Sequence, residues 1–370
     1  MKYLISIVLV LILFSCSQTV KIDNKKEIVK DVVVKNDSLV LPGEKHFKNV
    51  RQLTFGGDNA ETYWSFDNKN LVFQAKNKKW GVACDQIYVM DPEKGLGEAN
   101  EIPQLVSTGK GRTTCSFFMP GDSTIIYSST HLGDENCPPE PKPRADHKYV
   151  WPIYPSFDIF VADLKGNIKK RMTDTPGYDA EPTLSPDGSL IVFTSMRTGD
   201  LELFTMKTDG SDVKQVTHEL GYDGGAFFSP DGKKLVFRSS RPKTPEDIKE
   251  YKDLLKDGLV MPTNMELYTC NIDGSDLKQI TNLGNANWSP YYHPSGKKIL
   301  FSSNHESKRG FPFNLYMINI DGTGLERLSF GDSFISFPMF SWDGKRIVFS
   351  SNRNNGGTRD TNVFIADWVD

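Results

Sequence analysis

The sequence predicts an all-β protein, a six-bladed β-propeller spanning residues 46–370 of the 370-residue chain. Three observations support this fold: a strand-turn-strand pattern recurs six times, the copies follow one another at blade-like intervals, and the last copy lacks a fourth strand while a surplus strand precedes the first copy. Each sheet alone would leave apolar faces exposed. Radial packing of six sheets buries them.

Each copy begins with a short polar lead that ends in an apolar-hydroxyl dipeptide or a close variant of it. A tight-turn signal such as SPDGSL follows, then an alternating strand such as IVFTSMR and a further strand such as ELFTMK. The dipeptides that mark the six copies are Leu53-Thr54, Leu105-Val106, Met172-Thr173, Val216-Thr217, Ile280-Thr281 and Leu328-Ser329.

The ring is expected to close between the two ends of the repeat region. The sixth copy stops after its third strand, NVFIADWVD, whereas HFKNVRQLTF at residues 46–55 indicates a fourth strand with no copy before it. We expect these two segments to pair, which joins three strands from the end of the chain to one from its start.

The repeat pattern LTxxxGxxxxxPxxSPDGKxIxFxSxR, followed by IYxMxxDG, is fullest in residues 172–210 and 280–322. It resembles the propeller repeats of the periplasmic TolB family, and the resemblance covers residues 46–370. The resemblance does not cover the additional N-terminal domain that TolB carries before its propeller. The resemblance therefore implies the fold, and leaves open a role beside peptidoglycan-associated lipoprotein.

The start of the chain predicts export and lipid attachment. Residues 1–15 hold one Lys and an apolar run, which is typical of a signal peptide, and Leu13-Phe14-Ser15-Cys16 resembles a bacterial lipobox with Cys16 as the lipidated residue. Ser17 follows instead of the Asp that marks inner-membrane retention, so we expect the outer membrane, facing the periplasm. Residues 16–45 lack aromatic residues and predict a flexible tether.

Charge argues against a nucleic-acid partner. The chain has 44 Lys+Arg against 47 Asp+Glu and a net charge of -3, so no basic surplus can neutralise a phosphate backbone. We expect a monomer that is held to the membrane through Cys16 and contacts an envelope protein, peptide or glycan.

The positions of the long insertions predict which face of the disc carries the function. They fall at 132–157, 242–264, 306–312 and 354–361, all on the face that gathers the connections between second and third strands and between blades. Residues 242–264 predict a helix with Thr244 as N-cap, Asp247 in a capping box and Gly258 at its end.

Polar and aromatic residues on this face are the candidate ligand-binding groups, although Asp and Gly at such places can equally serve only as turn caps. Residues that end the second strands, including His131, Arg197, Arg241 and Arg353, could line the channel or hold sheets together. The ligand-binding candidates are Glu61, Arg112, His131, Trp151, Tyr178, Asp179, Glu181, Tyr222, Asp223 and Asn287.

The cysteines permit one disulfide among Cys84, Cys115 and Cys137 in an oxidising compartment, while Cys270 aligns with buried strand positions. Their spacing gives no support for zinc, and no metal or cofactor is predicted. Two function classes remain, a binding and assembly module or a propeller hydrolase or lyase. An enzyme could use Asp179, Glu181 or Asp223 with Arg112, or a nucleophilic Cys115; the absence of GxSxG, HExxH and P-loop motifs favours the binding module.

Overall fold

The computed structural model describes residues 39–97, 101–308 and 310–370. The predicted signal peptide, the lipidation site Cys16 and most of the predicted tether lie outside the described residues. None of the helices within the described ranges is both long enough and apolar enough to cross a membrane.

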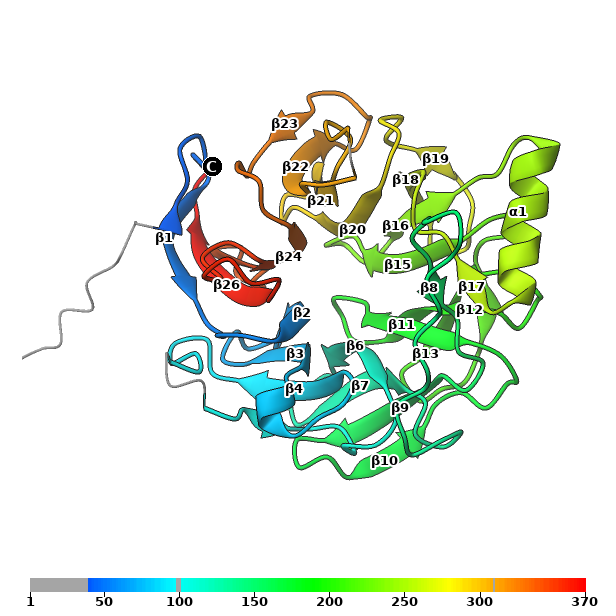
Figure 1. Ribbon diagram of the computed structural model, residues 1–370, viewed down its shortest axis with the longest axis horizontal. Coiled ribbons are helices and arrows are strands. Elements are labelled where there is room, and N and C mark those ends of the chain that lie inside the picture. The colour runs from blue at the N-terminus through cyan, green and yellow to red at the C-terminus, as the bar shows by residue number, and fades with distance from the viewer. Residues whose placement is uncertain (1–38, 98–100, 309) are drawn as a thin grey trace, which may run out of the picture. The chain divides into compact units, whose positions relative to one another are not determined.

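Six four-stranded antiparallel sheets, made by the described residues, surround a central channel (Figure 1). This arrangement confirms the predicted six-bladed propeller. In chain order from the inner to the outer edge, the blades are β2 (Asp58–Trp64), β3 (Leu71–Lys76), β4 (Gln86–Met90) and β5 (Gln104–Leu105); β6 (Thr113–Phe118), β7 (Thr124–Ser129), β9 (Asp158–Asp163) and β10 (Ile168–Arg171); β11 (Asp179–Leu184), β12 (Leu190–Ser195), β13 (Glu202–Lys207) and β14 (Lys214–Gln215); β15 (Asp223–Phe228), β16 (Lys234–Ser240), β18 (Met265–Asn271) and β19 (Lys278–Gln279); β20 (Asn287–Tyr292), β21 (Lys298–Ser303), β22 (Asn314–Asn319) and β23 (Glu326–Arg327); and β24 (Ile335–Phe340), β25 (Arg346–Ser351), β26 (Asn362–Trp368) and β1 (Phe47–Gln52).

The sixth blade contains the predicted closure. β1 pairs antiparallel with β26, with Arg51 opposite Ile365, so the first described strand completes the last sheet. Residues 39–45, which the sequence assigns to the tether, contact this blade instead. Glu44 is buried and forms an ion pair with Arg353, at 2.7 Å. The predicted tether boundary at residue 45 therefore lies too late, because a buried ion pair already holds this segment.

Turn chemistry explains why the first two strands of each blade lie together. In the SPDG turn of the third blade, the Ser185 hydroxyl donates to Asp187 at 2.6 Å, and the Gly188 N–H donates to the Ser185 carbonyl. Gly188 has φ +69°, a conformation that glycine adopts without a steric penalty. These turns are short, which leaves one face of the disc with few projecting loops.

The core lies between neighbouring blades. The same position of all six second strands carries an aromatic side chain with no exposed surface. This repeated aromatic fixes which face of each strand turns inward, because side chains alternate along a strand. The six residues are Phe73, Tyr127, Phe193, Phe237, Phe301 and Phe349.

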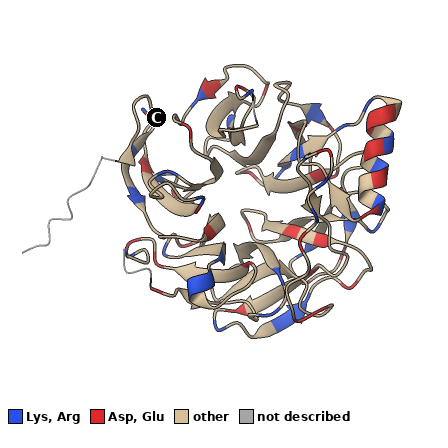
Figure 2. Cartoon of the chain, in the orientation of Figure 1, with Lys and Arg blue, Asp and Glu red and all other residues tan. Residues whose placement is uncertain are grey.

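Two insertions on the other face carry structure of their own. Residues 132–157 include β8 (Trp151–Pro152), and residues 242–264 include α1 (Pro245–Lys256) and β17 (Leu259–Val260). The helix has the predicted capping box between Thr244 and Asp247, and both signs of charge run along it (Figure 2). Tyr251 and Leu254 are its buried residues, so the apolar side of α1 packs on the propeller.

Candidate functional site

A β-bulge interrupts the innermost strand of every blade at the same place. At each bulge one residue has positive φ, between 48° and 60°, which is uncommon for residues other than glycine. We call these six residues the bulge ring, and all of them line one small cavity in the channel. They are Glu61, Cys115, Glu181, Gly225, Ser289 and Phe337.

The residues two positions after each bulge residue are mostly aromatic, and their side chains fill the channel. The Tyr63 ring packs edge-on against Phe227 at 5.5 Å between centroids, and Phe227 packs in the same way against Tyr291 at 5.1 Å. Phe117 joins this group, with its ring 5.7 Å from that of Tyr63. The cavity at the bulge ring is only about 30 Å3. The channel is therefore narrow at this depth, with an aromatic layer beneath the ring.

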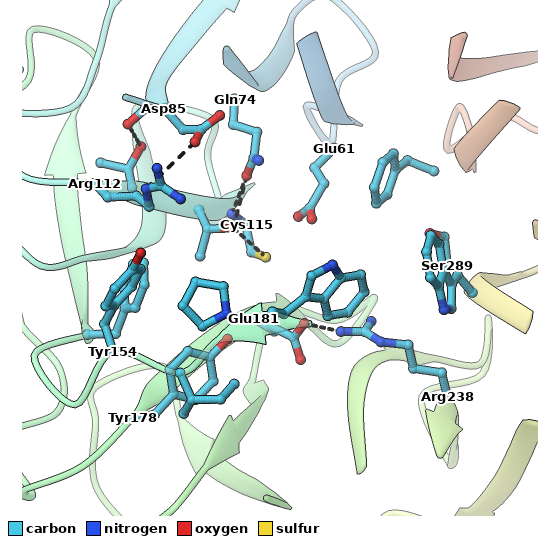
Figure 3. A pocket seen from close by; sticks show the side chains of 18 of the residues that line it. Glu61, Gln74, Asp85, Arg112, Cys115, Tyr154, Tyr178, Glu181, Arg238 and Ser289 are labelled. Atoms are coloured by element: carbon cyan, nitrogen blue, oxygen red, sulfur yellow. Dashed lines mark hydrogen bonds and ion pairs between the residues drawn. The ribbon is translucent and has the colours of Figure 1, made fainter. Parts of the chain in front are cut away.

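Above the bulge ring the channel widens into a pocket of about 410 Å3, which we call the channel-mouth pocket (Figure 3). Residues three positions before the bulge residues form part of its wall, and residues of insertion 132–157 cover it. Its principal lining residues are Glu61, Gln74, Asp85, Arg112, Cys115, Trp151, Tyr154, Tyr178, Glu181, Tyr222, Arg238, Trp288 and Ser289.

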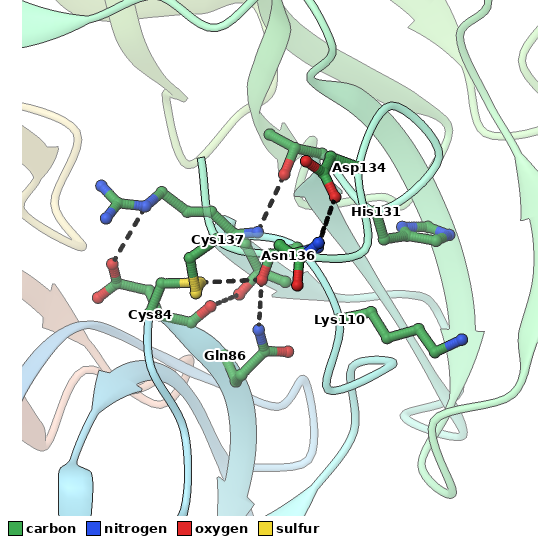
Figure 4. The surroundings of a disulfide bond; sticks show 12 residues. Cys84, Gln86, Lys110, His131, Asp134, Asn136 and Cys137 are labelled. Atoms are coloured by element: carbon green, nitrogen blue, oxygen red, sulfur yellow. Dashed lines mark hydrogen bonds and ion pairs between the residues drawn. A yellow bond between two sulfur atoms is a disulfide. The ribbon is translucent and has the colours of Figure 1, made fainter. Parts of the chain in front are cut away.

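Insertion 132–157 is fastened over the pocket at several points. A disulfide joins Cys137 to Cys84 of the β3–β4 connection, with 5.9 Å between their Cα atoms (Figure 4). Arg112 forms an ion pair with Glu140 and lies over the Tyr154 ring. These contacts tie the insertion to both of the first two blades and hold its aromatic residues in place.

The second insertion supports the first. β8 pairs with β17, which joins residues 132–157 to residues 242–264. Lys148 also donates to Glu250 of α1 at 2.7 Å. The Trp288 indole N–H donates to the Pro262 carbonyl at 2.8 Å, and its ring lies 5.2 Å from that of Trp151. We call the two joined insertions the roof of the pocket.

Glu181 is held as a carboxylate by its surroundings. It forms a buried ion pair with Arg238, and it accepts hydrogen bonds from Thr194 and from the backbone N–H of Gly225, both at 2.8 Å. Burial opposes ionisation, but Arg238 and these hydrogen bonds lower the pKa of Glu181 below its usual value. A Cβ at Gly225 would lie 1.8 Å from the Arg238 guanidinium, so glycine is required for Arg238 to reach across.

The surroundings of Glu61 raise its pKa, in contrast to those of Glu181. Burial, together with the nearby charge of Glu181, raises the pKa of Glu61 to about 7, although a hydrogen bond with Cys115 works against the rise. Burial also raises the pKa of the Cys115 thiol, which is consequently neutral and a poor nucleophile at neutral pH. Figure 3 shows the Glu61 carboxyl, the Cys115 thiol and the Glu181 carboxyl directed into the same space.

Comparison with known proteins agrees with this architecture. Residues 154–252 match the family model described as the TolB beta propeller domain. Over these residues the propeller is similar to the TolB type. An uncharacterised protein from Agrobacterium fabrum is 36% identical over 53 residues, which are 14% of this chain and 18% of that protein. The match thus spans under a fifth of that relative.

Solved structures resemble this propeller over most of its length. A protein described as TolB from Agrobacterium tumefaciens superposes with a TM-score of 0.53 at 20% identity, covering 85% of this chain and 91% of that one. An oligogalacturonate lyase from Vibrio parahaemolyticus gives a TM-score of 0.50 at 13% identity, covering 88% and 94%. At these identities the likeness establishes the fold alone.

The propeller brings six of the ten predicted ligand residues together in the channel-mouth pocket. They come from the innermost strands of blades one and three, from the segments that lead into the innermost strands of blades two, three and four, and from the roof. These six are Glu61, Arg112, Trp151, Tyr178, Glu181 and Tyr222.

Four predicted ligand residues lie elsewhere. Asp179 and Asp223 are buried in ion pairs with Arg197 and Arg241, the residues that follow the second strands of the same blades. These arginines therefore brace single blades and do not line the pocket. The Asn287 amide donates to the Met265 carbonyl of the preceding blade at 2.8 Å, and the His131 ring packs on Phe160 at 4.5 Å.

Several pocket residues were not among the predicted ligand residues, chiefly Arg238, Asp85, Trp288, Ser289 and Gln74. The cysteines were partly predicted: Cys84 and Cys137 form the disulfide, whereas Cys115 and Cys270 are free and buried. Within the described ranges no group of three or more His, Cys, Asp or Glu side chains is placed to hold a metal ion.

Proposed function

We propose that the protein is a lipid-anchored bacterial envelope protein whose propeller binds the end of a peptide or glycan chain in the channel-mouth pocket. The observation that carries the proposal is the roofed pocket itself. It is about 410 Å3 in volume, which suits one terminal residue or sugar ring better than a protein surface. Its narrow lower end favours a chain terminus over a segment that passes through.

The lining chemistry supports the same class of ligand. Aromatic faces of Trp151, Tyr178 and Trp288 offer stacking surfaces for a sugar ring or an apolar side chain. Charged groups at the bulge ring supply hydrogen bonds in a desolvated setting, which fix the orientation of a bound group. An envelope protein would then bind through the end of its own peptide or glycan chain, which enters this pocket.

Localisation at the outer membrane, facing the periplasm, is part of the proposal. The lipobox-like sequence before Cys16 supports it, and the disulfide between Cys84 and Cys137 is of the kind that persists in oxidising compartments. Metabolic labelling with an alkyne fatty acid tests the anchor. We expect label on the full-length protein and none on Cys16→Ser; equal labelling of both would contradict the proposal.

A peptide and glycan array, probed with the full-length protein, tests ligand binding. Trp151→Ala should weaken binding of any hit by about tenfold or more, because the side chain forms part of the roof and wall. Tyr268→Ala is the matched control, since this aromatic residue lies on β18 outside the pocket. Equal losses in both variants would show that the ligand binds elsewhere.

A propeller hydrolase or lyase is the second candidate function. The observation that favours it is the opposite pKa shifts of Glu61 and Glu181, which would leave one carboxyl as an acid and the other as a base near neutral pH. Asp179 and Asp223 do not line the pocket, because they lie in ion pairs with Arg197 and Arg241 of their own blades. Turnover of array hits by the unaltered protein, lost in Glu61→Gln, would identify an enzyme; hits recovered intact would contradict one.

A further inference from the structure

The channel-mouth pocket contains more acidic than basic groups. Three carboxyl groups line it, those of Glu61, Asp85 and Glu181, against the two guanidinium groups of Arg112 and Arg238. Arg238 is paired with Glu181, and the Arg112 Nε lies 4.0 Å from an Asp85 carboxylate oxygen. Both cations are therefore already matched to acids.

Glu61 is the acid left over. Among the side chains that the structure describes, it takes part in no salt bridge, and its polar side-chain contact is the Cys115 thiol. The backbone at Glu61 has φ +50° within the β2 bulge, so the carboxyl is fixed in the bulge ring at the narrow end of the pocket. A cation that reaches this depth would meet an unmatched carboxyl group.

The walls above Glu61 suit a cation as well. The aromatic residues Trp151, Tyr178, Tyr222, Trp288 and Phe337 line the pocket, and the negative face of an aromatic ring attracts an ammonium group. The protein already uses this interaction, because the Arg238 guanidinium lies 5.3 Å from the Trp151 ring centroid and 5.1 Å from that of Tyr222.

We propose that the pocket binds chain ends that carry a primary ammonium group, and that Glu61 is the counter-ion of that group. This inference rests on the proposed function of the pocket and names the chemistry of its ligand. A peptide α-amine and an amino sugar both supply such a group. Uncharged sugars and acylated termini do not.

Binding should depend on pH in a specific way. Burial and the charge of Glu181 raise the pKa of Glu61, so in the empty pocket this carboxyl is largely protonated below about pH 7. The other titratable and charged groups that interact with it are Tyr63, Cys115, Asp85 and Arg238. An ammonium group requires ionised Glu61, and binding therefore releases a proton. Affinity should fall about tenfold per pH unit below about pH 7, and above this value it should level off until the amine of the ligand itself loses its proton.

Isothermal titration calorimetry on the purified full-length protein tests this inference. The probes are benzylamine and benzyl alcohol, then the pairs glucosamine and glucose, and dialanine and N-acetyl-dialanine. We expect benzylamine to bind at least about tenfold more tightly than benzyl alcohol, with a proton released below about pH 7. Preference for glucosamine or for dialanine then identifies the source of the ammonium group.

Two variants make the result decisive. Glu61→Gln should abolish the preference for amines, whereas Glu202→Gln should keep it, because Glu202 is another buried carboxyl with a raised pKa but lies on β13 outside the pocket. Equal binding of the amine and alcohol probes, or a preference that survives in Glu61→Gln, overturns the inference while the proposed function stands. Failure of every probe and every array ligand to bind overturns both.

Discussion

Glu61→Gln should change how stability depends on pH. In the folded protein, burial raises the pKa of Glu61 from 4.5 to about 7. The folded state therefore binds more protons than the unfolded state between these values, and the free energy of unfolding falls as the pH rises through this window. For this group the loss is about 2 kcal/mol between about pH 5 and about pH 7. Glutamine does not titrate, so the variant lacks this loss.

Urea unfolding of the purified protein at several pH values measures the effect. The difference in free energy of unfolding, variant minus unaltered protein, should grow by about 2 kcal/mol from about pH 5 to about pH 7 and remain level at higher pH. A constant offset caused by the lost Cys115 contact would not affect this slope. Parallel profiles for the two proteins would refute the reasoning, because they would mean that Glu61 has an ordinary pKa when folded.

Three further predictions concern the disulfide, the closure of the ring and a buried ion pair. Replacing Cys84 and Cys137 by Ser opens a cross-link with a sequence separation of 53 residues, and should lower the free energy of unfolding by up to about 4 kcal/mol on chain-entropy grounds; an unchanged denaturation midpoint would contradict this. Deleting residues 46–55 should abolish cooperative unfolding, because β26 loses its outer neighbour β1 and the sixth sheet is left with three strands, whereas deleting the chain up to residue 38 should leave the melting temperature nearly unchanged; similar melting of both truncations would be the contrary result. Arg353→Leu should cost about 3–5 kcal/mol, since Glu44 is left buried and unpaired, and Glu44→Gln with Arg353→Leu should recover part of that loss in the same chemical denaturation assay.

The fold could be predicted from the sequence because its repeats are visible as turns and strands. A turn such as SPDG fixes where the second strand begins, and the aromatic at its third apolar position fixes which face is buried. The ring closure was predictable for the same reason, since a missing strand and a surplus strand stood at opposite ends of the repeats. The tether boundary was less visible, because Glu44 is polar and its partner Arg353 is distant in sequence.

The candidate site was only partly predictable because the innermost strands depart from simple alternation. Counting four residues back from the start of each turn motif leads to Glu61, Cys115, Glu181, Gly225, Ser289 and Phe337, so the bulge ring was present in the sequence as a register. The register is hard to recognise, because the six residues are of five types, with Glu occurring twice, that share no common chemistry. Arg238 was harder to predict, because it enters the pocket only through the space that Gly225 leaves empty.

The pairing of β1 with β26 has a consequence for how the molecule is made. β1 is synthesised early, whereas its partner β26 is synthesised almost last. The emerging chain therefore exposes an unpaired strand edge until synthesis is nearly complete. A chain that ends before β26 could not close the ring and would remain accessible to proteases. Ring closure therefore distinguishes complete chains from truncated ones.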